Sequence, residues 1–232
     1  ALVVASVSVI GIGAGAAGLI WGGSHDYVGL LAALALVGAG QALSFELAEV
    51  EGSLSVSVVG SLAGAALFDY RAALPLAVTI AVVDWSARRN SLHTVVYNVG
   101  TMALSSLAAA SVFTIYSGVG NIGRLVVVFG LGPLAGAVYF GVNMGLLSFA
   151  SGVEGHESPW AVFHERFAWL LPHYVVYGGI AAVMGIGYDA VGLYGLAVFA
   201  VPLLLMRKTQ EAYLKHTHRS AQKLRQAAET IQ

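Results

Sequence analysis

The first residues that could do chemistry are Gly13, Gly15 and Gly18, which follow an apolar run with the spacing GxGxxG. In a dinucleotide-binding unit these glycines form a tight turn, let the backbone approach a pyrophosphate and pack a helix against a strand. An acidic residue roughly 20 positions further on then binds the ribose. Here Asp26 comes too early for that role and Glu46 too late. The spacing alone therefore does not predict a nucleotide site.

Two histidine–glutamate pairs, His156 with Glu157 and His164 with Glu165, contain side chains that can bind zinc. The metalloprotease motif HExxH places two histidines one helical turn apart. In this chain the two histidines lie eight positions apart, with Pro159 between them, so the spacing does not favour a metal site. No GxSxG elbow and no Walker sequence occurs either. We therefore do not expect this chain to be an enzyme, and nothing in it identifies a cofactor.

Lysine and cysteine chemistry inside a membrane is also excluded. Lys208, Lys215 and Lys223 are the only lysines, and all follow the last apolar segment, so a retinal-type Schiff base cannot form within a span. Cysteine is absent, which excludes disulfides and thiolate sites.

The elements that must position the remaining polar residues are membrane helices. The chain has 232 residues, of which 58% are hydrophobic and 10% are charged, whereas soluble domains are about 25% charged. A membrane-crossing helix needs about 20 apolar residues. Segments of that kind predict an all-α, polytopic bundle with helices over 1–21, 27–45, 93–116, 124–150, 169–187 and, slightly short, 190–206.

Two shorter apolar segments lie between residues 53 and 85, "SLSVSVVGSLAGAALF" and "AALPLAVTIAVVDW". Serines are scattered through the first, and Pro75 interrupts the second. Counting both gives eight membrane segments, and a count from six to eight is consistent with the sequence. Interrupted segments lie within a membrane only where protein or a wet cavity satisfies their backbone groups. This pair therefore indicates a binding pocket.

The distribution of basic residues predicts the orientation, because cytoplasmic loops carry an excess of Lys and Arg. With the C-terminus in the cytoplasm, all of the 11 basic residues except Arg71 and Arg124 lie inside. We therefore expect an inner-membrane protein with both termini in the cytoplasm.

Glycines spaced four apart predict close helix packing, since small residues let membrane helices approach. Gly11 and Gly15 form one such pair, which also explains the opening motif, and Gly132 and Gly136 form another. The same reasoning applies to Gly141 and Gly145.

Ionisable and amide side chains inside or at the edges of spans are candidates for ligand binding, because they are costly there. An ion pair between Asp84 and Arg88, or hydrogen bonds between helices, would also explain such residues. The ligand-binding residues that we predict are Glu46, Asp84, His93, Asn98, Asn143, His173 and Tyr177.

The loop 151–169 predicts a short amphipathic helix that begins at Ser158-Pro159 and has Trp160, Phe163 and Phe167 on its apolar side. Such a helix would lie along the inner membrane surface, and covering a neighbouring span is a second interpretation of its apolar side.

The C-terminal segment 207–232 forms a second unit, separate from the bundle of residues 1–206. Its apolar residues repeat with a heptad spacing, and basic residues decorate the rest. A surface helix drawn to anionic lipid and a parallel dimer stalk are both consistent with this pattern. The stalk hypothesis makes the chain a homodimer that continues into a further domain, with Leu214, Ala221, Leu224 and Ile231 in the seam.

The stretches "DWSARRNSLHTVVYNVG", "NMGLLS" and "WLLPHYVVYGGIAAVMGIGYDAVGLYGLAVFAVPLLLMRKTQEAYLKHTHRSAQKLRQAAETI" resemble the N-terminal membrane sensor region of bacterial HD-GYP and GGDEF signalling proteins. The resemblance covers roughly residues 45–232 and implies an input domain for cyclic di-GMP turnover. The expected helical arrangement is also similar to the substrate-binding component of ECF-type vitamin transporters.

The sequence thus predicts a membrane sensor that binds a small molecule in its bundle and signals through the C-terminal helix to a cytoplasmic module. A transporter component and a structural membrane subunit remain the alternatives. The partners expected are the lipid bilayer, the small molecule and a second copy, and no nucleic acid.

Overall fold

The computed structural model describes residues 2–44, 56–118, 123 and 126–196, and every regular element in these ranges is helical. The predicted all-α fold is therefore confirmed. The elements are α1 (Leu2–Trp21), α2 (Tyr27–Ser44), α3 (Val56–Phe68), the 3₁₀ turn η2 (Asp69–Ala72), α4 (Ala73–Arg88), α5 (Leu92–Gly118), the π turn η3 (Val127–Leu131), α7 (Gly132–Gly155), α8 (Pro159–Val162), the π turn η4 (Phe163–Phe167), the 3₁₀ turn η5 (Ala168–Leu170) and α9 (Leu171–Val191).

Five helical stretches of the described chain are long and apolar enough to cross a membrane, which supports a polytopic membrane protein. Helix α2 is also apolar but shorter, over Tyr27–Ala42. Most of the predicted span 190–206 lies outside the described residues. The five stretches are Val3–Trp21, Ser57–Ala87, Leu92–Thr114, Val127–Gly155 and Pro159–Val191.

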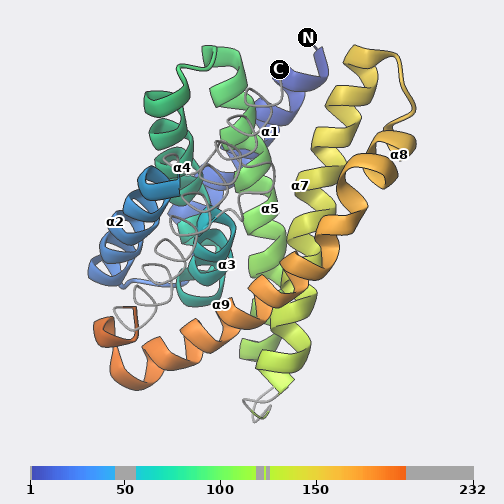
Figure 1. Cartoon of the computed structure of the whole chain (residues 1–232). Coiled ribbons are helices and arrows are strands. Elements are labelled where there is room, and N and C mark those ends of the chain that lie inside the picture. Colours follow the sequence, from blue (N-terminus) through green and yellow to red (C-terminus); the bar gives the residue numbers. More distant parts are fainter. Residues whose placement is uncertain (1, 45–55, 119–122, 124–125, 197–232) are drawn as a thin grey trace, which may run out of the picture.

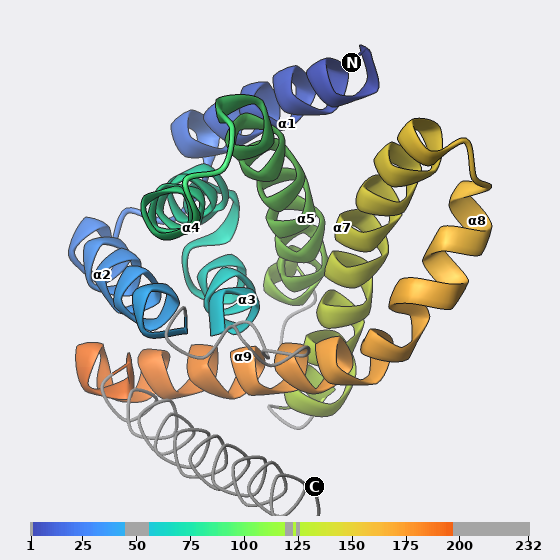
Figure 2. The same cartoon turned by 45° about the horizontal axis from the view of Figure 1, so that its top comes forward.

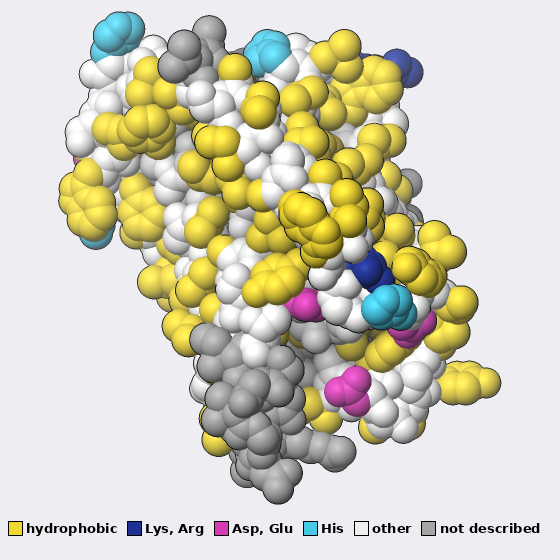
Figure 3. Space-filling view, turned by 180° about the vertical axis from the view of Figure 1, so that it is seen from behind, with side chains coloured by type: hydrophobic (Ala, Val, Ile, Leu, Met, Phe, Trp, Pro, Cys, Tyr) yellow, Lys and Arg dark blue, Asp and Glu magenta, His cyan; other side chains and the backbone are white. Residues whose placement is uncertain are grey.

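Many large hydrophobic side chains of the described helices are exposed on the surface of the bundle. Figure 3 shows hydrophobic side chains over most of one face, interrupted by a few charged groups. All four tryptophans, Trp21, Trp85, Trp160 and Trp169, are exposed. Soluble monomers rarely expose such large apolar surfaces, whereas tryptophan is enriched where membrane helices reach the lipid headgroups. The surface therefore fits a lipid environment.

Helix α5 occupies the middle of the fold, with α1 and α4 on one side and α7 on the other (Figures 1 and 2). Helix α9 packs along α7 and then crosses beneath α3 (Figure 2). The short helix α3 thus meets α2, α5 and α9, and its side chains Leu62 and Phe68 are completely buried. The main core lies where these helices meet.

Glycines hold the tightest helix contacts. Gly11 of α1 lies against the backbone of Gly100 in α5, and a Cβ atom added at Gly15 would be 3.0 Å from the Leu74 Cβ atom. A Cβ atom added at Gly132 would be 2.6 Å from the carbonyl oxygen of Gly178 in α9, and Gly136 lies against the Tyr174 backbone. No heavy atom lies within 4 Å of a Cβ atom added at Gly141 or Gly145, so these two do not form a close contact.

The break between α3 and α4 lies where the two predicted segments meet, at Asp69, which has a φ of 55°. The interruption predicted at Pro75 does not occur, because α4 runs unbroken from Ala73 to Arg88. Pro75 instead lies in the first turn of α4, where a helix does not need the missing N–H group. Since Asp and Asn adopt the left-handed conformation more readily than most residues, Asp69 is the residue that permits the reversal.

Arg71 follows the break and is buried, although the positive-inside pattern placed it in an outer loop. Its Nε atom donates to the carbonyl oxygen of Leu19 at 3.2 Å, and its Nη1 atom donates to the Ser24 carbonyl. The guanidinium also lies 5.5 Å from the centre of the Tyr27 ring. Carbonyl groups at a helix C-terminus carry partial negative charge, so the end of α1 compensates the buried charge of Arg71.

The surface helix predicted within residues 151–169 is instead the beginning of a longer one. Helix starts at Pro159, as the Ser-Pro pair predicts, but continues through η4 and η5 into α9. No Gly or Pro between Trp160 and Leu171 stops it. Trp160 is exposed, whereas the Phe163 ring packs 5.5 Å from the ring of Phe140 in α7. The aromatic side of this segment therefore covers α7.

Candidate functional site

Two of the predicted binding residues, Asp84 and His93, lie at helix ends. Asp84 is half-buried in α4, and its Oδ2 atom accepts a hydrogen bond from Asn90 at 3.2 Å. His93 is exposed in the first turn of α5, 3.4 Å from the Ser91 hydroxyl. His93 therefore precedes the buried part of α5, in which Tyr97 is the first buried polar side chain.

The other predicted residues are distributed over α5, α7 and α9. Asn98 and Asn143 are half-buried, and His173 is exposed with its ring edge-on to Trp169. Tyr177 is half-buried, and its hydroxyl oxygen is fully buried. Glu46 and the predicted stalk residues Leu214, Ala221, Leu224 and Ile231 lie outside the described residues.

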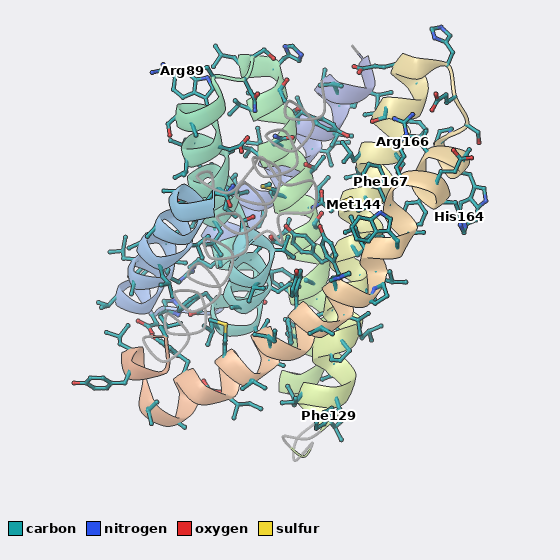
Figure 4. All side chains as sticks on the ribbon, viewed as in Figure 1. Arg89, Phe129, Met144, His164, Arg166 and Phe167 are labelled. Atoms are coloured by element: carbon teal, nitrogen blue, oxygen red, sulfur yellow. The ribbon has the colours of Figure 1, made fainter. Side chains whose placement is uncertain are left out.

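Figure 4 shows the side chains at the two ends of the bundle and along its helices. Arg89 lies at one end of the bundle and Phe129 at the opposite end. Met144 of α7 and Phe167 of η4 both pack against the main core. Exposed Arg166 pairs with Glu157 at 3.1 Å. The interior between these ends is therefore enclosed by apolar and aromatic side chains.

Four hydroxyl side chains meet in that interior, and we call them the hydroxyl cluster: Ser61 of α3, Tyr139 of α7, and Tyr174 and Tyr177 of α9. Ser61, Tyr139 and Tyr174 are buried, with exposed fractions of 1%, 1% and 6%. The Ser61 hydroxyl approaches that of Tyr139. The rings of Tyr139 and Tyr174 stack with their centres 6.1 Å apart, and Tyr174 and Tyr177 lie 6.0 Å apart. The cluster thus joins three helices.

The close glycine contacts position this cluster. Gly136 lies one helical turn before Tyr139, and Gly178 lies one turn after Tyr174. A Cβ atom added at Gly178 would be 2.8 Å from the backbone nitrogen of Gly136, so α7 and α9 touch through their backbones. This approach brings the Tyr139 and Tyr174 rings together. Small residues thus determine the geometry of the site.

Part of the hydrogen-bonding capacity in the cluster is unused. The Tyr177 hydroxyl oxygen is buried and has no hydrogen-bond partner, and the buried Ser61 hydroxyl approaches that of Tyr139 without forming a hydrogen bond of normal geometry. Ser106 of α5, whose neighbours Ala109 and Ala110 belong to the same core, also has a buried hydroxyl without a partner. Each unsatisfied buried polar group costs about 1–3 kcal/mol. A small polar molecule, or water, that supplied the missing partners would recover part of this free energy.

The cluster itself carries no charge. Its members are one serine and three tyrosines, and the one charged side chain that is buried among the described residues, Arg71, bonds to the end of α1. Bringing an ion into such an interior without an opposite charge is unfavourable. The arrangement therefore suits an uncharged ligand that can both hydrogen-bond and stack on aromatic rings.

Sequence reasoning identified part of this cluster. Tyr177 was predicted, and the serine-rich first segment indicated a pocket, but Ser61 itself and Tyr139 were missed. The available signals were the spacing of Ser57 and Ser61, four apart on one face of α3, and the position of Tyr139 after Gly136. Neither signal identifies the site unless it is already known which helices pack against each other.

The part of the chain that the structure describes contains no group of three His, Asp or Glu side chains able to hold a metal ion. Comparison with family models, curated proteins and solved structures finds no match to this chain.

Proposed function

We propose that this chain is the membrane-embedded input domain of a signalling protein, and that it binds a small uncharged molecule at the hydroxyl cluster. The observation that carries the proposal is that two hydroxyls of the cluster, Ser61 on α3 and Tyr177 on α9, are buried without a full hydrogen bond. Native proteins satisfy the large majority of their buried polar groups. A bound polar molecule would supply the hydrogen-bond partners that these hydroxyls lack.

The proposal includes an inner-membrane location with eight membrane segments and both termini in the cytoplasm. Arg89 and Arg166 lie toward the end of the bundle that also holds the N-terminus (Figures 1 and 4). The Arg71 side chain lies at the other end of α1. This distribution supports the orientation that the positive-inside rule predicts.

Helix α9 is the element that would transmit binding. It carries Tyr174 and Tyr177, packs on α3 and α7, and leads toward the C-terminal segment. A ligand needs only a few kcal/mol of differential affinity for two arrangements of such a bundle to shift their populations substantially. In the proposal this shift reaches a dimeric stalk at 207–232 and then a cytoplasmic module, for which cyclic di-GMP turnover is the expected activity.

Native mass spectrometry of the full-length natural protein in mild detergent tests this function, because it reports chain mass, stoichiometry and retained small molecules together. We expect a dimer of a longer chain that retains an uncharged small molecule. The variant Ser61→Ala should lose this molecule, whereas the exposed control Ser86→Ala should keep it. A monomer that ends near Gln232, or one bound to unlike subunits, would favour the transporter or structural alternative.

A further inference from the structure

A second polar contact lies outside the hydroxyl cluster, where the loop after α1 meets the end of α9. Asp26 uses both of its carboxylate oxygens there. Oδ1 accepts a hydrogen bond from the backbone N–H of Gly29 at 2.8 Å, which caps the start of α2. Oδ2 accepts a hydrogen bond from the hydroxyl of Tyr188, in the last turn of α9. One carboxylate thus joins α2 to a residue 162 positions later in the chain.

Two neighbouring residues hold this contact in place. A Cβ atom added at Gly29 would lie 2.5 Å from the Asp26 Oδ2 atom and would also meet the Tyr188 hydroxyl, so only glycine leaves room. The Tyr188 ring stands edge-on to Phe68, with ring centres 5.8 Å apart. Phe68 is fully buried and is the last residue of α3, the helix that carries Ser61. A movement of α3 would therefore press directly on Tyr188.

The chain leaves α9 immediately after this contact. The carbonyl of Tyr188 accepts a hydrogen bond from Gly192 at 2.7 Å, which closes the helix. Gly192 has a φ of 60° and a ψ of −140°, a conformation that glycine adopts far more readily than other residues. Gly195 then donates to the Gly192 carbonyl at 2.9 Å. Gly192 consequently ends α9 and turns the chain four residues after Tyr188.

We propose that Asp26, Gly29 and Tyr188 form a clasp that fixes the exit of the chain from α9, and that α3 acts on this clasp through Phe68. The clasp itself follows from the contacts above, whereas its part in signalling rests on the proposed function. The hydrogen bonds from Tyr188 and Gly29 hold the pKa of Asp26 below its usual value. The carboxylate therefore stays ionised at neutral pH, and titration near neutral pH does not open the clasp.

Pulsed electron paramagnetic resonance tests the clasp without any ligand. The full-length protein is used, and residues 1–232 contain no cysteine. Spin labels can thus be placed at Val28→Cys and Val191→Cys, two exposed positions on α2 and α9. We expect one narrow distance distribution in this labelled protein. Tyr188→Phe, which removes only the hydroxyl, and Gly29→Ala, which fills the space that the hydroxyl occupies, should both broaden or shift it.

The matched control is Tyr194→Phe, which changes an exposed tyrosine near the same end and should leave the distribution unchanged. A second label pair at Val9 and Val96, on α1 and α5, reports whether each variant remains folded. A narrow, unshifted distribution in folded Tyr188→Phe would overturn the clasp. That result would leave ligand binding untouched, because mass spectrometry measures it separately. Loss of ligand retention with an intact clasp would instead refute the proposed function alone.

Discussion

Replacing Gly136 by alanine tests the contact that brings Tyr139 and Tyr174 together. The added Cβ atom would overlap the carbonyl oxygen of Tyr174 and would lie 2.8 Å from the carbonyl carbon of the same residue. Carbon atoms in contact prefer about 3.5–4.0 Å. Since the opposing atoms belong to the backbone of α9, no side chain can rotate away. The two helices must therefore separate by more than about 1 Å at this point.

The net effect combines two opposing terms. Overpacking of this kind costs about 1–3 kcal/mol, whereas alanine gains about 0.5–1 kcal/mol over glycine inside a helix. We expect Gly136→Ala to lower the free energy of unfolding by about 1–2 kcal/mol and, since 1 kcal/mol corresponds to about 2–4 °C at this size, to lower Tm by about 2–8 °C. Separation of the helices should also weaken retention of the small molecule.

Thermal unfolding in detergent measures this difference, and α7 supplies a matched control. Gly141 lies on the same helix with nothing within 4 Å of an added Cβ atom. Gly141→Ala should therefore leave Tm unchanged or raise it slightly. Equal Tm values for the two variants would show that α7 and α9 do not meet at Gly136, which would refute the packing argument and the geometry of the hydroxyl cluster with it.

The remaining predictions concern Arg71, Asp26 and the hydroxyls of the cluster. Arg71→Gln should destabilise the protein by about 2–4 kcal/mol, because carbonyls at the end of α1 lose a charged donor. Arg166→Gln, which removes an exposed ion pair, should cost about 0–1 kcal/mol, and equal losses in Tm would contradict the account of Arg71. Asp26→Asn should lower Tm at neutral pH, because a carboxyl whose pKa is depressed in the fold stabilises it only while ionised. The difference from the natural protein should stay constant down to about pH 4 and vanish as the pH falls below 3.8 and through the lowered pKa, and a difference that grew in acid would contradict this sign. Asp26→Asn leaves the other charged and titratable groups on the surrounding elements in place, namely His25, Tyr27, Asp69, Arg71, Tyr188 and Asp189. Ser61→Ala should lower Tm when a polar molecule occupies the cluster, and a rise in Tm would indicate that the hydroxyl is buried in a dry, empty core.

The helical fold could be predicted because its determinants are local in the sequence. Apolar runs of sufficient length give the helices, and the spacing of Gly11 with Gly15 and of Gly132 with Gly136 indicates faces that can approach closely. The partners of those faces could not be predicted, since each glycine meets a helix that is distant in sequence. Gly141 and Gly145 have the same spacing but meet nothing.

The site was predicted only in part, and the reason is the direction of each side chain. Asp84, His93 and His173 are candidates in the sequence because ionisable groups are costly in a membrane. In the structure these side chains are half-buried or exposed, near helix ends or on the bundle surface. In the sequence alone, nothing distinguishes Ser61 and Tyr139 from the other serines and tyrosines. They become a site only because α3, α7 and α9 meet around them.

The position of Arg71 could not be predicted for the same reason, because the direction of its side chain depends on the fold. A single arginine between two apolar segments predicts an exposed loop charge. The break at Asp69 instead turns the guanidinium back toward α1, where it is buried against the carbonyls of Leu19 and Ser24. Only the three-dimensional reversal of the chain makes this contact possible.

The central claim is that the interior at the hydroxyl cluster receives small polar molecules, and radiolytic hydroxyl-radical labelling tests it most directly. The radicals form from water and modify aromatic rings that water reaches. After exhaustive detergent exchange to remove retained molecules, the rings of Tyr139 and Tyr174 should be modified although both are buried. The buried ring of Phe68, which packs against Tyr188 outside the cluster, is the control and should stay unmodified. Modification of Tyr139 and Tyr174 no greater than that of Phe68 would show a dry core and contradict the account.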